Sequence, residues 1–204
     1  MLWHDFMFAC ALYPDYQDWF REAVERELDH QTRRLRNHAS IALWCGGNEN
    51  HWGFVDWWDA PIFCGAECYN RIAPQVVARN CPEVPYWNSS PYGGPHPNGD
   101  EAGDRHHWHE CMMSSEMAQR IAPEEYGKVG AKFVSEYGYI GPCCKSSVIR
   151  YHGGAAIDRS SSTWRHHNNT FERGTVVAGI EKHYRDAAEL SLDDYPLYGG
   201  PARG

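Results

Sequence analysis

Residues 40–50 read SIALWCGGNEN, and this stretch decides the fold class. Its first six residues, 40–45, form an unbroken apolar run with β-branched and aromatic members, which is typical of a strand buried on both faces. Two glycines end the run, and the polar residues 48–50 follow at once. Buried strands of this kind belong to parallel sheets, so the stretch predicts an α/β protein with polar groups gathered at a strand end.

The sequence on either side alternates between helical and strand patterns. Before the central strand, apolar side chains recur at helical spacing over residues 15–37. Four further strands are expected at 2–8, 84–87, 106–110 and 131–135. Further helices are expected within 61–80, in part of 116–128 and over 172–190, with an aromatic loop at 52–58.

Alternating strands and helices with polar residues after the strand ends predict a (β/α) barrel. A complete barrel takes about 250 residues, whereas this chain has 204. We therefore expect an interior piece of a TIM barrel over residues 1–195, followed by an unstructured tail over 196–204.

Composition excludes several classes of protein. The chain carries 19 basic and 27 acidic residues, a formal charge of −8, which argues against a nucleic-acid partner. No apolar run reaches the roughly 18–20 residues of a membrane helix, and residues 1–5 do not resemble a signal peptide. Eight cysteines are too few for a disulfide scaffold, so we expect reduced thiols and a cytoplasmic location. The histidines and cysteines show no zinc-site spacing, and we expect neither a metal nor a cofactor.

Two glutamates occupy equivalent positions. Glu49 and Glu136 each follow an apolar strand and lie beside glycine in polar and aromatic surroundings. In a parallel barrel the carboxyl ends of the strands meet on one face. Two carboxylates that face each other across a sugar ring are what glycoside hydrolysis needs, although two ordinary exposed glutamates would give the same pattern.

Several ordered blocks of the sequence resemble the glycoside hydrolase family 2 β-mannosidases. The blocks are WHDFMFACALYP at 3–14, RNH at 36–38, SIALWCGGNEN at 40–50, PYW at 85–87, SSP at 89–91, GDRHHW at 103–108 and FVSEYGY at 133–139. They follow the order of that family and cover about residues 1–142. Because a lone Asn-Glu pair would mean little, the specificity comes from the ordered series.

The resemblance implies a role for each matching residue. Glu136 would be the nucleophile of a retaining exo-β-mannosidase, and Glu49 the acid and then the base, with carboxyl groups about 5–5.5 Å apart. Asn48 would bind the 2-hydroxyl of the sugar. Asp5 and His106 would bind other hydroxyls, and Trp3, Trp57 and Trp108 would form walls of the subsite. The partner would be a β-mannoside or manno-oligosaccharide, together with the missing domains of a parent chain.

The chain departs from the family pattern in places. Gly47 stands where the family usually has a second asparagine, and residues 110–111 are Glu-Cys where Val-Trp is usual. The first two barrel strands would precede Met1 and the last would follow Tyr195. We therefore expect a fragment of the catalytic domain that folds poorly or associates by itself and has little activity.

Two alternatives stay open at this level. One is another family 2 specificity, such as a β-galactosidase or a β-glucuronidase. The other is an inactive, truncated sugar-binding fragment.

Overall fold

The computed structural model describes residues 1–109, 112–138, 143–154, 156–158, 160–167, 171 and 173–183. The chain divides into two compact units. Unit 1 comprises Met1–His106 and Gly130–Glu136, and unit 2 comprises the described residues of His107–Val129 and Tyr137–Gly204. The predicted tail at 196–204 and the end of the predicted helix at 172–190 lie outside the described residues, as do Glu110, Cys111 and Tyr139 of the sequence motifs.

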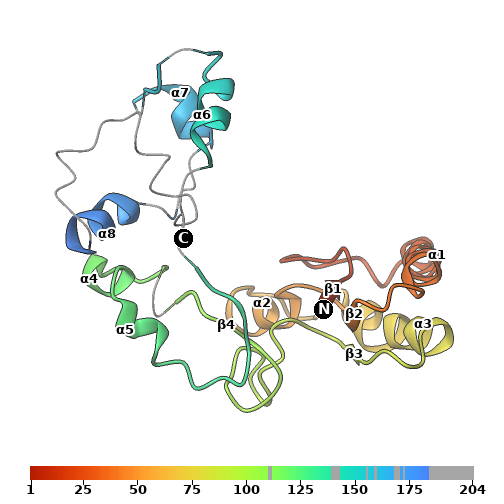
Figure 1. Cartoon of the computed structure of the whole chain (residues 1–204). Helices are drawn as coiled ribbons and strands as arrows, with labels where there is room; N and C mark the ends of the chain where they lie inside the picture. Colours follow the sequence, from red (N-terminus) through yellow and green to blue (C-terminus); the bar gives the residue numbers. More distant parts are fainter. Residues whose placement is uncertain are drawn as a thin grey trace. The chain divides into compact units, whose positions relative to one another are not determined.

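Unit 1 contains two small sheets with helices between the strands (Figure 1). Its strands are β1 (Leu2–Asp5), β2 (Ile41–Cys45), β3 (Tyr86–Trp87), β4 (Arg105–His106) and β5 (Val134–Glu136), and its helices are α1 (Asp18–Leu35), α2 (Asn50–Asp56), the π-helical turn η1 (Cys68–Ile72) and α3 (Ala73–Asn80). The sheet orders are β1-β2-β3 and β4-β5. Every pairing among these described strands is parallel, as the buried run at 40–45 predicted.

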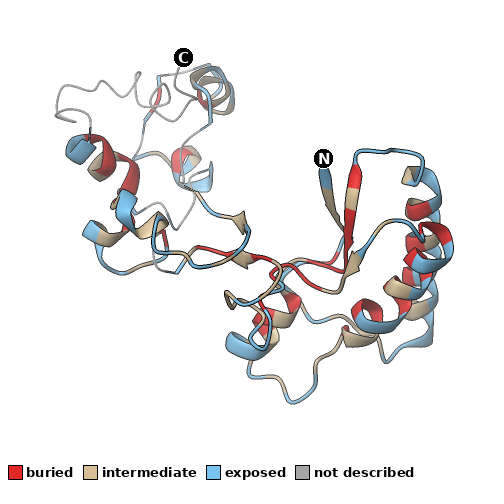
Figure 2. Ribbon diagram, turned by 60° about the horizontal axis from the view of Figure 1, so that its bottom comes forward, coloured by how far each residue is buried: buried red, intermediate tan, exposed pale blue. Residues whose placement is uncertain are grey.

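The core of unit 1 lies between the first sheet and the helices α1 and α3. Leu28 of α1, Trp44 of β2 and Val76 of α3 are buried members of one apolar cluster, whose buried positions are red in Figure 2. Parallel strands need a crossover to return in the same direction, and α1 and the η1–α3 pair supply the two crossovers. The sheet and its crossovers thereby bring the carboxyl ends of three strands to one edge.

The structure corrects some element boundaries. Residues 52–58 were expected to be a loop, but residues 50–56 form α2, in which Trp52 is buried against its neighbours. The strands β1, β3 and β4 are shorter than predicted, and β5 is shifted so that Glu136 is its last residue. These strands are short because a strand extends only where a neighbouring strand offers backbone hydrogen bonds, and their neighbours do so over a few residues.

Unit 2 is helical in its described part. Its helices are α4 (Met117–Arg120), α5 (Pro123–Tyr126), α6 (Lys145–Tyr151), α7 (Ser162–His167) and α8 (Thr175–His183). The break between α4 and α5 falls before Pro123, as predicted, because proline fits the first turn of a helix and not its interior. Val148, Trp164 and Ile180 belong to a small buried cluster. No helix among the described residues is long and apolar enough to cross a bilayer.

Candidate active site

The backbone beyond β1, β2 and β3 continues to pair and forms the floor of the candidate site. Asn48 forms parallel bridges to Ala9 on one side and to Ser90 on the other. The Asn48 amide N–H donates to Phe8, and the Glu49 N–H donates to the Ser90 carbonyl at 2.6 Å. The polar residues after the central strand are therefore fixed by backbone hydrogen bonds on both sides.

Glu49 stands where this strand extension turns into α2. Its φ of 58° lies in the left-handed region, which is uncommon for a residue with a side chain. The carboxyl group is held at both oxygens, because Oε1 lies 2.9 Å from Nδ1 of His106 and Oε2 accepts the Cys10 thiol at 3.1 Å. The side chain is 13 % exposed, so the carboxyl group is partly shielded from water.

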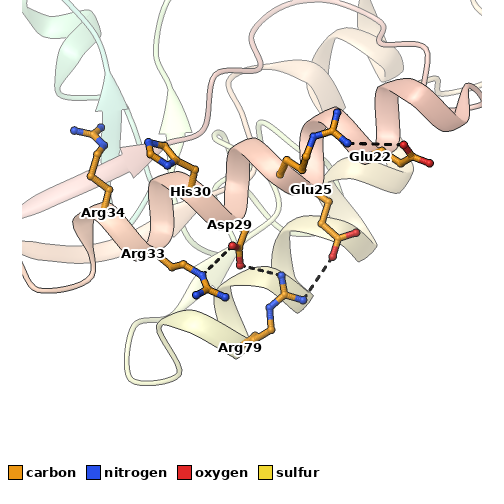
Figure 3. A pocket seen from close by; sticks show the side chains of 8 residues that line it. Glu22, Glu25, Asp29, His30, Arg33, Arg34 and Arg79 are labelled. Carbon is orange, nitrogen blue, oxygen red and sulfur yellow. Dashed lines mark hydrogen bonds and ion pairs between the residues drawn. The ribbon is translucent and has the colours of Figure 1, made fainter.

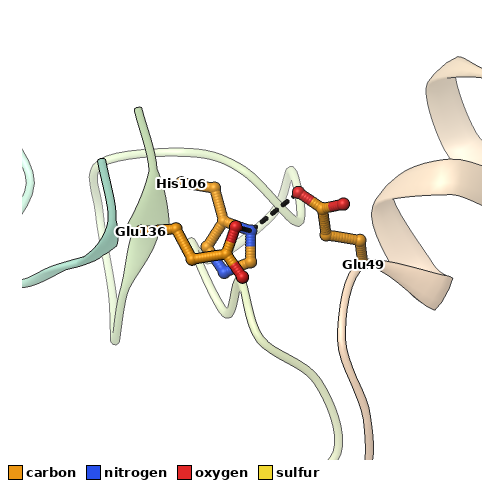
Figure 4. A group of neighbouring side chains, drawn as sticks. All are labelled: Glu49, His106 and Glu136. Atoms are coloured by element: carbon orange, nitrogen blue, oxygen red, sulfur yellow. Dashed lines mark hydrogen bonds and ion pairs between the residues drawn. The ribbon is translucent and has the colours of Figure 1, made fainter. Parts of the chain in front are cut away.

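Glu136 approaches the same histidine from the second sheet. It ends β5 and pairs in register with His106 of β4. Its Oε2 lies 3.3 Å from His106 Nδ1, and its side chain is 36 % exposed. Figure 4 shows Glu49 reaching the imidazole from the start of α2, while Glu136 lies on the strand beside that of His106. The structure therefore brings together the two predicted catalytic residues and His106.

These three side chains are also the set that a metal ion could use among the described residues. One ligand atom from each of Glu49, His106 and Glu136 lies within 4.8 Å of the others. The same atoms already contact one another through the histidine, and this geometry needs no ion to explain it. We assign no metal to the site.

A buried polar group supports His106 from behind. The imidazole is completely buried, and its Nε2 lies 2.9 Å from the Ser90 hydroxyl. Ser90 donates in turn to Oδ2 of Asp104, which is also completely buried. Asn98 holds the His106 backbone, accepting from its N–H at 2.8 Å and donating to its carbonyl at 3.0 Å.

The remaining predicted residues divide between the two units. Trp3 donates from Nε1 to Asp5 at 2.8 Å, so these two predicted sugar ligands contact each other. The Trp3 ring packs edge-on against Trp87 and stacks on Phe133. The Asn48 amide lies 3.7 Å from the Cys10 sulfur.

The predicted tryptophan walls have different surroundings. Trp57 packs at 4.6 Å against Trp52, which lies edge-on to His106. Trp108 belongs to unit 2 and is described with that unit only. The roles predicted for these residues, and for His106 as a hydroxyl ligand, stay predictions.

Cys10 is a member of the site that the sequence reasoning missed. Its φ of 44° is also left-handed, and its thiol contacts Glu49. Burial and the neighbouring Glu49 carboxyl group raise the pKa of this thiol to about 11, which keeps it protonated as a donor. No local pattern marks Cys10 as functional, since it lies 39 residues before Glu49.

Ser90 and Asp104 were also missed, although both lie inside the quoted blocks. A serine or aspartate before a turn is common for purely local reasons. The signal that could have found Ser90 is its position after a predicted strand end, the same signal that marked the two glutamates, whereas Asp104 precedes its strand and has no such signal.

A groove on the helices of unit 1 lies elsewhere. It has a volume of about 810 Å³ and runs along α1 and α3 (Figure 3). Its lining is almost wholly charged: Glu22, Glu25, Arg26, Asp29, His30, Arg33, Arg34 and Arg79. It has no aromatic surface for a sugar ring and lies on the helices, away from the strand ends, so it is not the candidate site.

Known proteins resemble this chain in both sequence and structure. A β-mannosidase of Capra hircus is 36% identical over 157 residues, and β-mannosidase B of Aspergillus terreus is 33% identical over 152 residues. Each match covers 68% of this chain and 17% of the relative, so the chain spans about one sixth of these curated proteins. No protein-family profile matches the chain.

A solved structure extends the likeness to nearly the whole chain. The crystal structure of a β-D-mannosidase from Dictyoglomus thermophilum matches with a TM-score of 0.78 and 36% identity, over 98% of this chain and 24% of that one. The resemblance to β-mannosidases that the sequence blocks indicated is confirmed by these matches.

Proposed function

Because this chain is related to the β-mannosidases, we propose that it carries the catalytic carboxylates of a retaining exo-β-mannosidase of glycoside hydrolase family 2. Glu136 is the nucleophile and Glu49 the acid and base. The two parallel sheets of unit 1 are, in this proposal, parts of a partial (β/α)8 barrel whose strand ends face the sugar.

The observation that carries the proposal is the convergence of two carboxyl groups on one point. Ligand oxygens of Glu49 and Glu136 lie within 4.8 Å of each other and of His106 Nδ1. Retaining glycosidases place their carboxyl groups about 5–5.5 Å apart, whereas inverting enzymes need about 6.5–9.5 Å to admit a water molecule. The short separation therefore supports direct attack by one carboxylate on the sugar.

The unequal exposure of the two carboxyl groups supports Glu49 as the acid and Glu136 as the nucleophile. Glu49 is the more enclosed, at 13 % exposed against 36 % for Glu136. Enclosure favours the neutral form of a carboxyl group, as a proton donor requires, whereas the nucleophile must be ionised.

The reaction then has two steps. In the first, a Glu136 oxygen bonds to the anomeric carbon while the bond to the leaving group breaks, and Glu49 gives its proton to the departing oxygen. In the second, Glu49 takes a proton from water, whose oxygen displaces Glu136 from the sugar. The chain supplies both proton transfers from side chains, and no cofactor takes part.

The groups around the two carboxylates define the proposed sugar site. Asn48 hydrogen-bonds the 2-hydroxyl, and Asp5 and His106 bind other hydroxyls. Within unit 1, Trp3 and Trp57 offer apolar ring surface to the sugar, and the wall role of Trp108 stays a prediction from the sequence. The substrate in this proposal is a terminal β-mannoside, and manno-oligosaccharides are the natural class to test.

Covalent trapping tests the proposal. The chain is incubated with 2-deoxy-2-fluoro-β-mannosyl fluoride, and its intact mass and labelled peptide are determined. A single label on Glu136 is expected, and the Glu136→Gln variant should take none. A folded chain that acquires no label would contradict the proposed activity and favour a truncated sugar-binding fragment. Faster labelling by the galactosyl or glucuronosyl reagent would instead indicate another family 2 specificity.

A further inference from the structure

Asp104 is a buried acceptor with several donors directed at it. Its side chain is completely buried, and Oδ2 accepts the Ser90 hydroxyl at 2.7 Å and also the Ser135 hydroxyl. Oδ1 accepts the Tyr92 backbone N–H at 2.8 Å. An ionised carboxylate can only accept hydrogen bonds, and three donors around this group match that state.

The Ser90 hydroxyl then fixes the hydrogen on one nitrogen of His106. A hydroxyl group has a single proton, and Ser90 directs it to Asp104. The Ser90 oxygen must therefore accept from His106 Nε2, which lies 2.9 Å away, whereas Asp104 itself is 3.8 Å from that nitrogen. Nε2 carries a hydrogen in this arrangement.

The other nitrogen consequently faces Glu49 without a hydrogen of its own when the ring is neutral. Nδ1 lies 2.9 Å from Oε1 of Glu49 and 3.3 Å from Oε2 of Glu136. Two acceptors at 2.9 Å repel unless a proton lies between them. The Cys10 thiol donates to Oε2 of Glu49, which leaves Oε1 as the oxygen directed at the ring.

We propose that Asp104 and Ser90 are positioning residues that hold His106 with its hydrogen on Nε2, so that Glu49 and His106 Nδ1 share the proton used in the acid step. The inference rests on the proposed function for the role of Glu49. The relay excludes a neutral ring that carries its only hydrogen on Nδ1 and donates it to an ionised Glu49. Glu136 lies farther from Nδ1, at 3.3 Å, and is the nucleophile in the proposed function.

The hydrogen bonds that run from Asp104 through Ser90 and His106 to Glu49 form a relay. The nitrogen chemical shifts of histidine test this relay without any enzymatic turnover. The full chain is labelled with ¹⁵N-histidine, and the His106→Gln variant assigns one of the twelve histidines. The expected spectrum shows protonated Nε2 of His106 at every pH from about 5 to 9, with Nδ1 either bare or sharing a proton. A neutral ring with the hydrogen on Nδ1 would overturn the inference, as would random-coil signals from all histidines.

Matched variants distinguish control of the His106 tautomer by Ser90 from a purely structural contact with the His106 backbone. Ser90→Ala should let the neutral ring move its hydrogen to Nδ1, because the acceptor that holds the hydrogen on Nε2 is removed. Ser90→Thr keeps the hydroxyl and should restore the original tautomer. Asn98→Ala removes the side chain that holds the His106 backbone, and its spectrum should keep the hydrogen on Nε2.

The outcomes distinguish this inference from the proposed function. An unchanged tautomer in Ser90→Ala would overturn the relay even if Glu136 is labelled in the trapping experiment. A folded chain could also show the expected tautomer but acquire no fluoromannosyl label on Glu136. The hydrogen bonds would then be a structural network, and their proposed catalytic role would be refuted.

Discussion

At the residue scale, the site is defined by how tightly Glu49 is held. Its backbone is fixed by the Ser90 carbonyl, and its two carboxyl oxygens contact His106 and Cys10. Both Glu49 and Cys10 adopt left-handed backbone conformations, which cost of order 1–3 kcal/mol each and persist where the surroundings fix them. The strain is concentrated where the proposed proton transfer takes place.

Removing the acid should separate the two chemical steps. Glu49→Gln is expected to lower turnover of a mannoside with a poor leaving group by about 10²–10⁴-fold, the usual contribution of a general acid. Azide should restore much of the rate with an activated aryl mannoside, since azide attacks without a general base. Steady-state rates for both substrates measure this, with the exposed Glu22→Gln as the control. Equal losses for both substrates and no effect of azide would contradict the assignment.

The thiols of Cys10 and Cys144 should react with alkylating reagents at very different rates. Burial and Glu49 raise the pKa of Cys10 to about 11, whereas the Ser146 and Ser147 hydroxyls lower the pKa of Cys144 to about 7. The thiolate is the reactive form, and its nucleophilicity falls as its pKa falls, so at pH 8 Cys144 should be alkylated by iodoacetamide about tenfold faster than Cys10. Peptide mapping after timed labelling measures this. Glu49→Gln should speed the labelling of Cys10 and leave Cys144 unchanged, and equal wild-type rates would refute the prediction.

At the element scale, the close approach of β2 to β3 requires glycine. A Cβ atom at Gly46 would overlap the Asn88 carbonyl oxygen and would lie 2.5 Å from the Tyr86 hydroxyl. Residues after the strand can be brought beside Ser90 only because the two backbones meet here. This is a physical reason for the glycine that ends the central apolar run.

Gly46→Ala should therefore destabilise unit 1. Forcing a methyl group against the backbone costs about 1–3 kcal/mol, because the strands must separate. Urea unfolding of the variant measures the change. Gly130→Ala is the control, because its Cβ would meet only the flexible end of Asp100 at 3.2 Å, and its change should stay within about 0.5 kcal/mol. Equal stabilities of the two variants would argue against the close approach.

The packing of α1 on α3 includes a polar clamp at Asp29. Asn80 donates to Oδ1 of Asp29 at 2.9 Å, Arg79 contacts the same oxygen at 3.1 Å, and Arg33 lies 2.8 Å from Oδ2. The Asn80 hydrogen bond and then the two arginines lower the pKa of Asp29 to about 2.

The clamp should make stability depend on acid pH. A carboxyl group whose pKa is lower in the folded state stabilises that state above its unfolded pKa, near 3.8, and loses this contribution as the pH falls to about 2. Asp29→Asn should thus be less stable than wild type at pH 7 and equal to it near pH 2. Urea midpoints at the two pH values measure the difference, and a constant difference would exclude the mechanism.

At the scale of the whole molecule, the two units differ in the size of their cores. Among the described residues, the main cluster of unit 1 has thirteen buried members and that of unit 2 has five. Buried apolar area is the main stabilising contribution to a fold, so unit 1 should be the more resistant to opening.

Hydrogen exchange should show this difference directly. The amides of Leu28, Trp44 and Val76 in unit 1 are expected to exchange at least about tenfold more slowly than those of Val148 and Ile180 in unit 2. Exchange followed by mass spectrometry at neutral pH measures both sets in one sample. Leu28→Ala, which removes a completely buried side chain, should reduce the difference. Slower exchange in unit 2 would contradict the prediction.

The sequence by itself determined the local elements and the two glutamates. The apolar run at 40–45 predicted a buried parallel strand, and helical periodicity placed the helix that became α1, because both patterns depend on neighbouring residues alone. The position of Glu49 and Glu136 after strands marked them as a pair, and the ordered blocks identified the related proteins.

Only the tertiary structure decided which side chains touch that pair. Cys10 reaches Glu49 across 39 residues, and Ser90 joins Asp104 to His106 across 14 and 16 residues. Nothing in a local pattern encodes these contacts, because they join residues of separate strands and loops that only the folded chain brings together. Residues 52–56 of the aromatic segment lie in α2 for the same kind of reason, since burial of Trp52 against neighbouring segments, and not local composition, selected this conformation.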